Sequence, residues 1–329
     1  MARNFAKQEF DRRQALALGG ALLFSGLKAG FGAEPPAPPA IPVPDNWHAA
    51  PRLALWPAQP PGVSSFRPPA PPADWPASYL RAVAMPELHV FRPARPNGRS
   101  MLVMPGGAYW FVSVVNEGAE LAPLLTRLGW TVFVLTYRLP GEGWAARSDV
   151  PLQDAQRAMR IIRAHAGEYG IDPAKVAALG FSAGGHLAAT LATRHAERVY
   201  APVDAADTQD PRPFAAGLIY PVITLRDPWT HELSRRLLLG ENPSQADIDR
   251  RSAELHVDAV TPPLFVVHAF DDAAVPVDNS LRMVEAMRKA RRPVEAHLLQ
   301  EGGHAFGIGR PGTPSAHWIE MLTAWMERV

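Results

Sequence analysis

Short apolar runs alternate with amphipathic segments along the chain after about residue 85. The apolar runs have strand length and lie at 88–91, 101–104, 131–135, 175–179, 217–220, 264–268 and 294–299. Between them, apolar residues recur every three or four positions, which predicts helices at 119–129, 154–166, 185–191, 283–289 and 316–326. The first run, 88–91, alternates like an edge strand. Strands that alternate with helices predict an α/β fold with a mostly parallel central sheet and helices on both faces.

Residues 1–33 have the composition of an export signal. Arg12 and Arg13 close a basic start, and the apolar run 15–27 that follows is too short to span a bilayer comfortably. The stretch 11–16 resembles the twin-arginine export signal of bacteria. We therefore expect export to the periplasm or beyond, with no stable membrane association after signal removal. An uncleaved membrane anchor is the alternative.

Residues 34–76 are crowded with proline, which lacks a backbone N–H and fits neither a helix interior nor a central strand. We expect an extended, proline-rich N-terminal arm that lies along the body of the molecule. Trp47, Trp56 and Trp75 are unusual in a pure linker, and we expect them to anchor the arm by packing. Stacking on carbohydrate is the alternative. The remaining residues, 77–329, are then expected to form one α/β domain.

The composition argues against several kinds of partner and cofactor. The formal net charge of the 329 residues is +1, which argues against binding nucleic acid through phosphate neutralisation. There is no cysteine, so disulfides and thiolate metal sites are excluded. No constellation of metal ligands stands out in the sequence, and we expect neither a metal nor another cofactor. The oligomeric state stays open.

Residues 180–184 read Gly-Phe-Ser-Ala-Gly, with a strand-like run before them and a helix-like run after them. A sharp turn from strand to helix needs glycines because the neighbouring backbones approach too closely for a Cβ. Such a turn raises the Ser182 hydroxyl above the sheet, where a substrate carbonyl can reach it. Ser182 is therefore the predicted nucleophile, and an N-cap serine between packing glycines is the alternative.

A serine hydroxyl is a weak nucleophile near neutral pH and needs a base that a carboxylate orients. In this kind of fold both partners follow later strands, first the acid and then the histidine. His304 lies in a glycine-containing loop after the last strand and is the predicted base. Asp271 and Asp272 both follow an earlier strand; the spacing to the next Val-Pro pair favours Asp272, with Asp271 as a loop-capping residue. His186 and His268 are interpreted as structural histidines.

A tetrahedral intermediate also needs backbone N–H donors for its oxyanion. The amide of Ala183, directly after the nucleophile, is one candidate. The other is expected in the glycine turn that follows the strand 101–104, at Gly107 with Gly106 or Ala108 as neighbours. A plain tight turn at this place is the alternative.

At these motifs the chain resembles the α/β-hydrolase superfamily, and more closely the short-chain and carbohydrate acetylesterases with a Pro-Gly-Gly-Gly-Tyr oxyanion loop. The resemblance covers about residues 85–329. Its motifs lie at 105–109, 117–118, 136–140, 151–158, 180–187, 272–276 and 303–307. It implies an α/β-hydrolase catalytic domain over 77–329 and substrates such as acetylated xylan. One position departs from the family loop: Ala108 replaces the third glycine, which puts the geometry of this part of the oxyanion hole in doubt.

Together these observations predict a secreted serine esterase that hydrolyses short-chain (acetyl) esters of plant polysaccharides or oligosaccharides. Tyr109 and Trp110, beside the oxyanion loop, are candidate substrate contacts that would cap a small acyl pocket. The alternatives are a generic carboxylesterase or feruloyl esterase, a serine peptidase, and a non-catalytic carbohydrate-binding protein. Whether the polar helical segment 231–254 forms a lid stays open.

Overall fold

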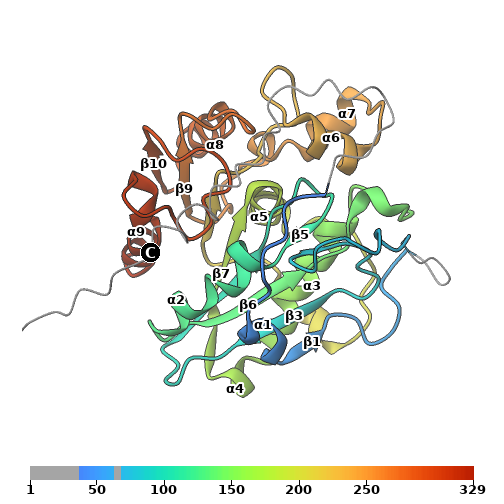
Figure 1. Cartoon of the computed structure of the whole chain (residues 1–329), viewed down its shortest axis with the longest axis vertical. Helices are drawn as coiled ribbons and strands as arrows, with labels where there is room; N and C mark the ends of the chain where they lie inside the picture. The colour runs from blue at the N-terminus through green and yellow to red at the C-terminus, as the bar shows by residue number, and fades with distance from the viewer. Residues whose placement is uncertain (1–36, 63–67) are drawn as a thin grey trace, which may run out of the picture.

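A computed structural model describes residues 37–62 and 68–329 (Figure 1). The predicted export signal, residues 1–33, lies outside the described residues. The centre of the fold is an eight-stranded sheet with the strand order β1-β3-β6-β4-β7-β8-β9-β10. Its strands are β1 (Arg52–Ala54), β3 (Glu87–Phe91), β4 (Gly98–Met104), β6 (Thr131–Thr136), β7 (Ile171–Phe181), β8 (Ala216–Ile219), β9 (Leu264–Ala269) and β10 (Val294–Leu299). The pairs β1/β3 and β3/β6 are antiparallel, and the other neighbours are parallel.

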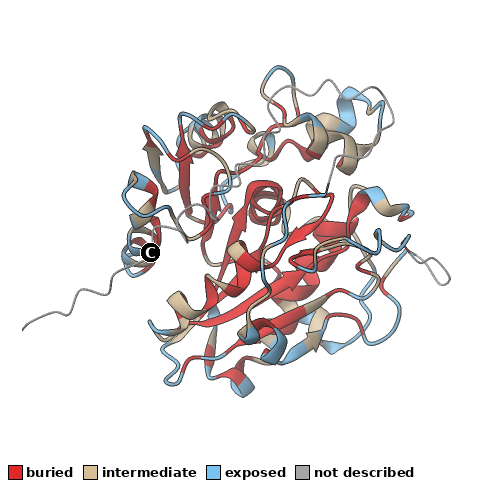
Figure 2. Cartoon of the chain, in the orientation of Figure 1, coloured by how far each residue is buried: buried red, intermediate tan, exposed pale blue. Residues whose placement is uncertain are grey.

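Helices pack on both faces of this sheet, as the sequence pattern predicts for an α/β fold. They are α2 (Ala122–Thr126), α3 (Val150–Ala164), α4 (Ala166–Tyr169), α5 (Ser182–Arg194), α8 (Asp278–Lys289) and α9 (Trp318–Met326). Two further helices, α6 (Glu232–Leu239) and α7 (Gln245–Arg251), lie together away from the sheet (Figure 1). Figure 2 shows that the buried residues concentrate in the central strands and in α3 and α5. All six residues of β6 and of β9 are buried, because strands covered on both faces need apolar side chains in both directions. No helix in the described part of the chain is long and apolar enough to cross a bilayer.

The register of the parallel strands brings four loops together at one edge of the sheet. Met104 at the end of β4 pairs with Gly180 near the end of β7, so the loop after β4 starts beside the turn that carries Ser182. Ala269 at the end of β9 pairs with Leu299 at the end of β10. The loops that contain the acid and the histidine therefore leave the sheet side by side. Ligands of open α/β sheets bind at this carboxyl edge, where such loops converge.

The proline-rich segment differs from the extended arm that its composition predicts. Its proline-free stretches form the short helix α1 (Asp45–Ala49) and the strand β1, which pairs with β3. The prediction that 88–91 is an edge strand is therefore wrong, because β1 covers that edge. Trp47 and Trp56 are buried, and Trp47 stacks on His89 with ring centroids 3.7 Å apart. These two tryptophans pack into the body of the protein, with no face left for a carbohydrate.

The helix predicted at 119–129 is shorter and begins differently. A single π-helical turn, η1 (Val115–Ala119), precedes α2, and the N–H of Glu120 donates to the carbonyl of Val115 at 2.9 Å. Single π-helical turns are rare and are frequent at functional sites. A two-stranded sheet pairs β2 (Tyr79–Leu80) with β5 (Val112–Ser113), so the segment before the domain is joined to the loop after β4.

Candidate active site

Ser182 lies at the turn from β7 into α5, in a backbone conformation that few residues adopt. Its φ is +51°, in the left-handed region that costs a residue with a Cβ about 1–2 kcal/mol. The glycine two residues later permits the turn: a Cβ on Gly184 would lie 2.0 Å from the carbonyl oxygen of Met104. The side chain of Ser182 is thereby raised at the carboxyl edge of the sheet, at the first turn of α5.

The structure brings Ser182, His304 and Asp272 into one hydrogen-bonded chain. His304 Nε2 lies 2.9 Å from Ser182 Oγ, and His304 Nδ1 lies 2.6 Å from Asp272 Oδ2. These distances are within hydrogen-bond reach for proton transfer from the hydroxyl to the imidazole. The Asp272 side chain is fully buried and that of His304 is partly exposed, so a ligand can approach the imidazole but water does not solvate the carboxylate.

Every lone-pair direction of the Asp272 carboxylate is used. Oδ1 accepts the backbone N–H groups of Ala274 and Val275, each at 2.9 Å. Oδ2 accepts from His304 and also from Nε2 of His268 at 3.1 Å. Burial alone would raise the pKa of Asp272, but the hydrogen bonds from His268 and His304 outweigh it and hold the pKa well below its usual range. Asp272 is therefore an ionised acceptor across the pH range of ordinary assays.

Asp271, the alternative acid, has a different environment. Its Oδ1 accepts the N–H of Gly303 at 2.8 Å, and its side chain is exposed. The contact ties the acid loop to the loop that carries His304. Asp271 is thus a loop-capping residue, and the carboxylate in contact with the imidazole belongs to Asp272.

His268 is buried, as expected of a structural histidine, but it also contacts the acid. Its Nδ1 lies 2.8 Å from Ser280 Oγ, which leaves Nε2 to donate to Asp272. The spacing of four residues between His268 and Asp272 across the end of β9 was a signal that the sequence contained. The role that sequence reasoning gives His268 is therefore incomplete.

The loop after β4 lies against the nucleophile. A Cβ on Gly106 would be 2.9 Å from the Cβ of Ser182 and 2.8 Å from the carbonyl oxygen of Phe181. Gly107 has φ +126°, and Ala108, where the resemblance predicts a third glycine, has φ +56°. The methyl group of Ala108 has therefore not changed the left-handed backbone, and it adds strain to this loop.

The expected oxyanion donors have different surroundings. The N–H of Gly106 donates to Glu117 Oε2 at 2.6 Å, so the expectation that Gly106 offers its amide to a ligand is wrong. The Gly106 amide holds the loop instead. Ala183 is in the first turn of α5, where a backbone N–H has no acceptor within the helix. Gly107 and Ala183 remain the predicted donors.

Tyr109, expected to contact a substrate, is buried under the oxyanion loop. Its hydroxyl lies 2.8 Å from His186 Nδ1, and His186 Nε2 donates to the carbonyl of Arg251 at 2.7 Å. Burial, the largest influence, and the nearby Arg251 charge lower the pKa of His186 to about 4. A neutral imidazole therefore links Tyr109 to α7, and Tyr109 is a packing residue rather than a substrate contact.

Trp110 is also buried, with 5% of its surface exposed. Its ring packs edge-on against Trp75 with centroids 5.1 Å apart, and it lies beside Phe111 and Tyr79. Leu237 of α6 packs on the same cluster. Trp110 thus joins the segment before β2 to the oxyanion loop, and it has no exposed face for a substrate in this conformation.

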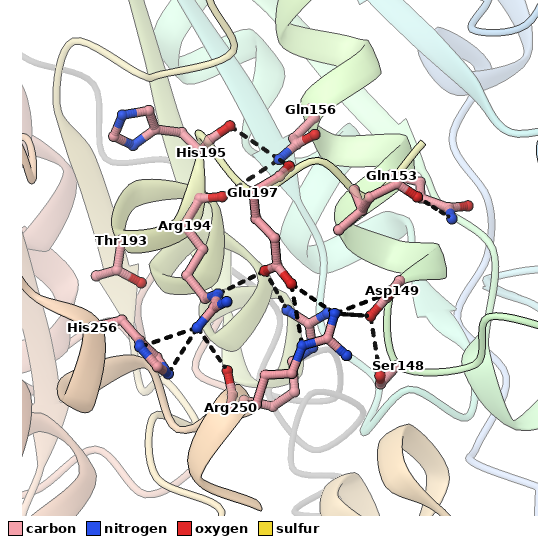
Figure 3. A network of polar contacts seen from close by, with 12 residues as sticks. Ser148, Asp149, Gln153, Gln156, Thr193, Arg194, His195, Glu197, Arg250 and His256 are labelled. Carbon is pink, nitrogen blue, oxygen red and sulfur yellow. Dashed lines mark hydrogen bonds and ion pairs between the residues drawn. The ribbon is translucent and has the colours of Figure 1, made fainter. Parts of the chain in front are cut away.

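A network of ion pairs holds the segment 231–254 to the body of the protein (Figure 3). Arg250 and Arg251 of α7 both pair with Glu197 after α5 and with Asp149 before α3. Arg194 of α5 pairs with Glu197 at 2.6 Å. Although burial opposes it, these arginines lower the pKa of Glu197 to about 2, so the network is fully charged at neutral pH.

The start of the same segment lies near the catalytic chain. His231, directly before α6, has its pKa lowered to about 4 by burial and then by the charge of His304. Within the described ranges, no group of three or more histidine or carboxylate side chains is arranged to hold a metal ion.

Backbone strain concentrates at the candidate site. In the described part of the chain, seven non-glycine residues have a left-handed φ. Five of them lie in the loops of this site: Ala108, Tyr109, Ser182, Tyr220 and Ala305. Strained residues persist only where their surroundings over-determine the backbone, and they cluster at functional sites.

Comparisons with known proteins find esterases among the similar chains. A family model described as BD-FAE matches residues 88–287. An acetylxylan esterase of Xylanibacter ruminicola is 32% identical over 243 residues, which are 73% of this chain and 47% of that protein. LipM of Mycobacterium tuberculosis, a probable carboxylic ester hydrolase, is 32% identical over 214 residues, which are 62% of this chain and 48% of LipM. The chain therefore spans about half the length of these two curated relatives.

Among solved structures, an acetyl ester-xyloside bifunctional hydrolase from Caldicellulosiruptor lactoaceticus superposes with a TM-score of 0.72 at 31% identity. The match covers 85% of this chain and 96% of that chain.

Proposed function

This chain belongs to the BD-FAE family and has the α/β-hydrolase fold, and from that premise we propose that it is a serine esterase that hydrolyses short-chain, chiefly acetyl, esters. The observation that carries the proposal is the chain of contacts from Ser182 Oγ through His304 to Asp272, with distances of 2.9 and 2.6 Å. A nucleophile, a base and an acid in this arrangement, below a loop of strained backbone, fit acyl transfer through a covalent intermediate.

Ser182, His304 and Asp272 each have a distinct part in the first half of the proposed reaction. Ser182 Oγ attacks the ester carbonyl carbon while His304 Nε2 takes its proton. Asp272, ionised and held by backbone amides, keeps the proton of the imidazole on Nδ1 and stabilises the imidazolium. The N–H groups of Gly107 and Ala183 donate hydrogen bonds to the tetrahedral oxyanion, and each such donor contributes about 3 kcal/mol of stabilisation.

The second half of the reaction uses the same groups. The imidazolium of His304 gives its proton to the leaving alkoxide, and the alcohol departs. Water then attacks the acyl group on Ser182, and His304 takes a proton from that water. The second tetrahedral intermediate collapses as the imidazolium of His304 returns this proton to Ser182 Oγ, which releases the carboxylic acid and restores the free serine.

We propose an acetylated plant polysaccharide or oligosaccharide, such as acetylated xylan, as the substrate class. Support comes from the names of two similar proteins, an acetylxylan esterase and an acetyl ester-xyloside hydrolase.

The test is the release of acetate from acetylated xylan by the purified protein, with acetyl, butyryl and octanoyl model esters measured in parallel. Ser182→Ala is the matched control, because it removes one oxygen atom and leaves the fold intact. Acetate release that disappears in Ser182→Ala supports the full proposal. Activity on the model esters alone would make the protein a generic carboxylesterase or a feruloyl esterase, and faster turnover of octanoyl than acetyl esters would contradict the acyl preference.

Two outcomes would refute the serine mechanism itself. One is near wild-type hydrolysis by Ser182→Ala in a clean preparation. The other is failure of a fluorophosphonate probe to label Ser182, which would favour a non-catalytic carbohydrate-binding protein.

We also propose export by the twin-arginine route, on the basis of Arg12 and Arg13 and the apolar run after them. Replacement of both arginines by lysine in the full chain should leave the protein in the cytoplasmic fraction of a bacterial host. Unchanged export of this variant would contradict the proposal.

A further inference from the structure

Glu117 is a buried carboxyl group that the proposed reaction does not use. It lies in the π-helical turn η1, and 3% of its surface is exposed. Its neighbours in the chain are valine, asparagine, glycine and alanine, so Glu117 is the one ionisable residue in the run 115–119. Burial of a carboxyl group is costly unless its oxygens are hydrogen-bonded, so its partners point to its role.

One oxygen of Glu117 holds the oxyanion loop. Oε2 accepts the N–H of Gly106 at 2.6 Å. Burial raises the pKa of Glu117, although the hydrogen bonds from Gly106 and Tyr220 oppose this rise. Gly106 directly precedes Gly107, the predicted oxyanion donor. A Cβ on Gly106 would lie 2.9 Å from Ser182 Cβ and 3.1 Å from Glu117 Oε2, so loop, nucleophile and carboxyl are in direct contact.

The other oxygen of Glu117 reaches the loop that carries the base. Oε1 accepts the hydroxyl of Tyr220 at 2.9 Å, and the Tyr220 oxygen in turn accepts the N–H of Gly307 at 3.1 Å. The Tyr220 ring packs edge-on against His304 and Phe306, with centroids 5.0 and 4.5 Å apart. A single carboxyl therefore connects the oxyanion loop, through Tyr220, with the ring of His304 and with the residues that follow it.

The residues at both ends of this connection are strained. Ala108 has φ +56°, Tyr220 has φ +37° and Ala305 has φ +55°. Without these hydrogen bonds, each segment would lower its free energy by about 1–3 kcal/mol by relaxing to an ordinary backbone conformation. The hydrogen bonds from Gly106 and Gly307 to this network oppose that relaxation.

We propose that Glu117 is a positioning residue that sets the distance between the oxyanion donors and the imidazole of His304. It acts on Gly107 through Gly106 and on His304 through Tyr220. The inference rests on the proposed serine esterase function, since it assigns Glu117 a part in that same site. It predicts an effect on the turnover step, because the distance matters most when the oxyanion and the imidazolium exist together.

The first experiment compares Glu117→Ala and Glu117→Gln with the wild type on acetyl model esters. The amide of Glu117→Gln can still accept the N–H of Gly106 and can donate to the oxygen of Tyr220, so it keeps the geometry without the charge. Glu117→Ala should lower kcat about 100-fold with little change in KM, because a displacement near 1 Å costs about that much. Glu117→Gln should restore kcat to within about fivefold of the wild type, since the network loses only part of one hydrogen bond. Glu120→Ala, three residues further along, is the matched control and should stay within about twofold.

Two results would overturn the proposal. Near wild-type kcat for Glu117→Ala would mean that the oxyanion loop and the loop of His304 keep their positions without Glu117. Equal losses of kcat in Glu117→Gln and Glu117→Ala would mean that a carboxylate charge at this position affects turnover and that the hydrogen-bond geometry does not. These two results require an active wild-type enzyme. A wild-type protein without any Ser182-dependent hydrolysis would instead refute the proposed function itself.

A second measurement does not depend on activity or on a foldable alanine variant. Tyr220→Phe removes one hydroxyl and leaves the ring against His304. Hydrogen–deuterium exchange should then quicken in peptides covering 301–309, because the N–H of Gly307 loses its acceptor. In Glu117→Gln, the peptides covering 105–113 should keep wild-type exchange. Unchanged exchange at 301–309 in Tyr220→Phe would show that Glu117 does not hold the base loop.

Discussion

Asp272→Asn is the substitution whose effect can be followed furthest through the contacts of the site. Oδ1 of Asp272 faces two backbone N–H groups, which can only donate hydrogen bonds and so require an acceptor at this position. The oxygen of the new amide must therefore face the backbone, and its NH2 group must face His304 and His268. His304 then has to present a lone pair at Nδ1 and carry its proton at Nε2.

An imidazole in that tautomer cannot take the proton of Ser182 Oγ, 2.9 Å away. If the proposed mechanism holds, the loss in kcat is about 10⁴-fold, as for the acid-to-amide change in a serine-protease triad, which corresponds to about 5.5 kcal/mol. The fold should survive, because the buried amide keeps its size and most of its hydrogen bonds. The loss therefore measures the tautomer and orientation of His304 rather than its presence.

The assay is the hydrolysis of a chromogenic acetyl ester at pH 7, with thermal unfolding measured on the same preparations. Asp271→Asn is the matched control, because Asp271 accepts the N–H of Gly303, and an amide oxygen can accept the same N–H. We expect it to stay within about threefold of the wild type. Comparable losses in both variants, or more than a tenth of wild-type activity in Asp272→Asn, would refute this reasoning.

Three further predictions concern stability, each measured by urea unfolding. Ala108→Gly should raise the free energy of unfolding by about 1 kcal/mol, since glycine accepts φ +56° without strain, and an unchanged value would show that the loop is not strained. His186 has a pKa of about 4 in the folded protein, mainly through burial, against about 6.5 in unfolded chains, so its contribution is present above pH 6.5 and is lost as the pH falls toward 4. His186→Gln should therefore flatten the decline in stability between pH 6.5 and 4, and a decline as steep as in the wild type would count against this assignment. The pKa of Glu197 is lowered to about 2 by neighbouring arginines despite partial burial, so its contribution is present above about pH 4.5 and is lost as the pH falls toward 2. Glu197→Gln should lower stability at pH 7 by about 1–2 kcal/mol, and the difference from the wild type should vanish near pH 2.

The sequence was most informative where a local pattern fixes local geometry. The strand-turn-helix pattern around Ser182 requires a particular backbone whatever the rest of the fold does, and the parallel direction of β9 and β10 places the loops of Asp272 and His304 at the same edge of the sheet. The apolar runs predict β4, β6 and β9 because strands buried on both faces need uninterrupted apolar side chains. Patterns failed where a segment depends on distant partners. β1 is three residues long and exists because β3 offers an open edge, and no periodicity marks such a strand.

Within the candidate site, the sequence by itself was enough to predict Ser182, His304 and Asp272 as nucleophile, base and acid, because each lies in a motif in a short stretch of chain. Only the tertiary structure decided what Tyr109, Trp110, Gly106 and Glu117 do. Their roles depend on which atoms lie opposite them across the fold: His186 for Tyr109, Trp75 for Trp110, and Glu117 for Gly106. Burial and hydrogen-bond pairing depend on residues that are distant in the sequence and meet only in the folded chain. The geometry of a turn, in contrast, is specified by the residues next to it in the sequence.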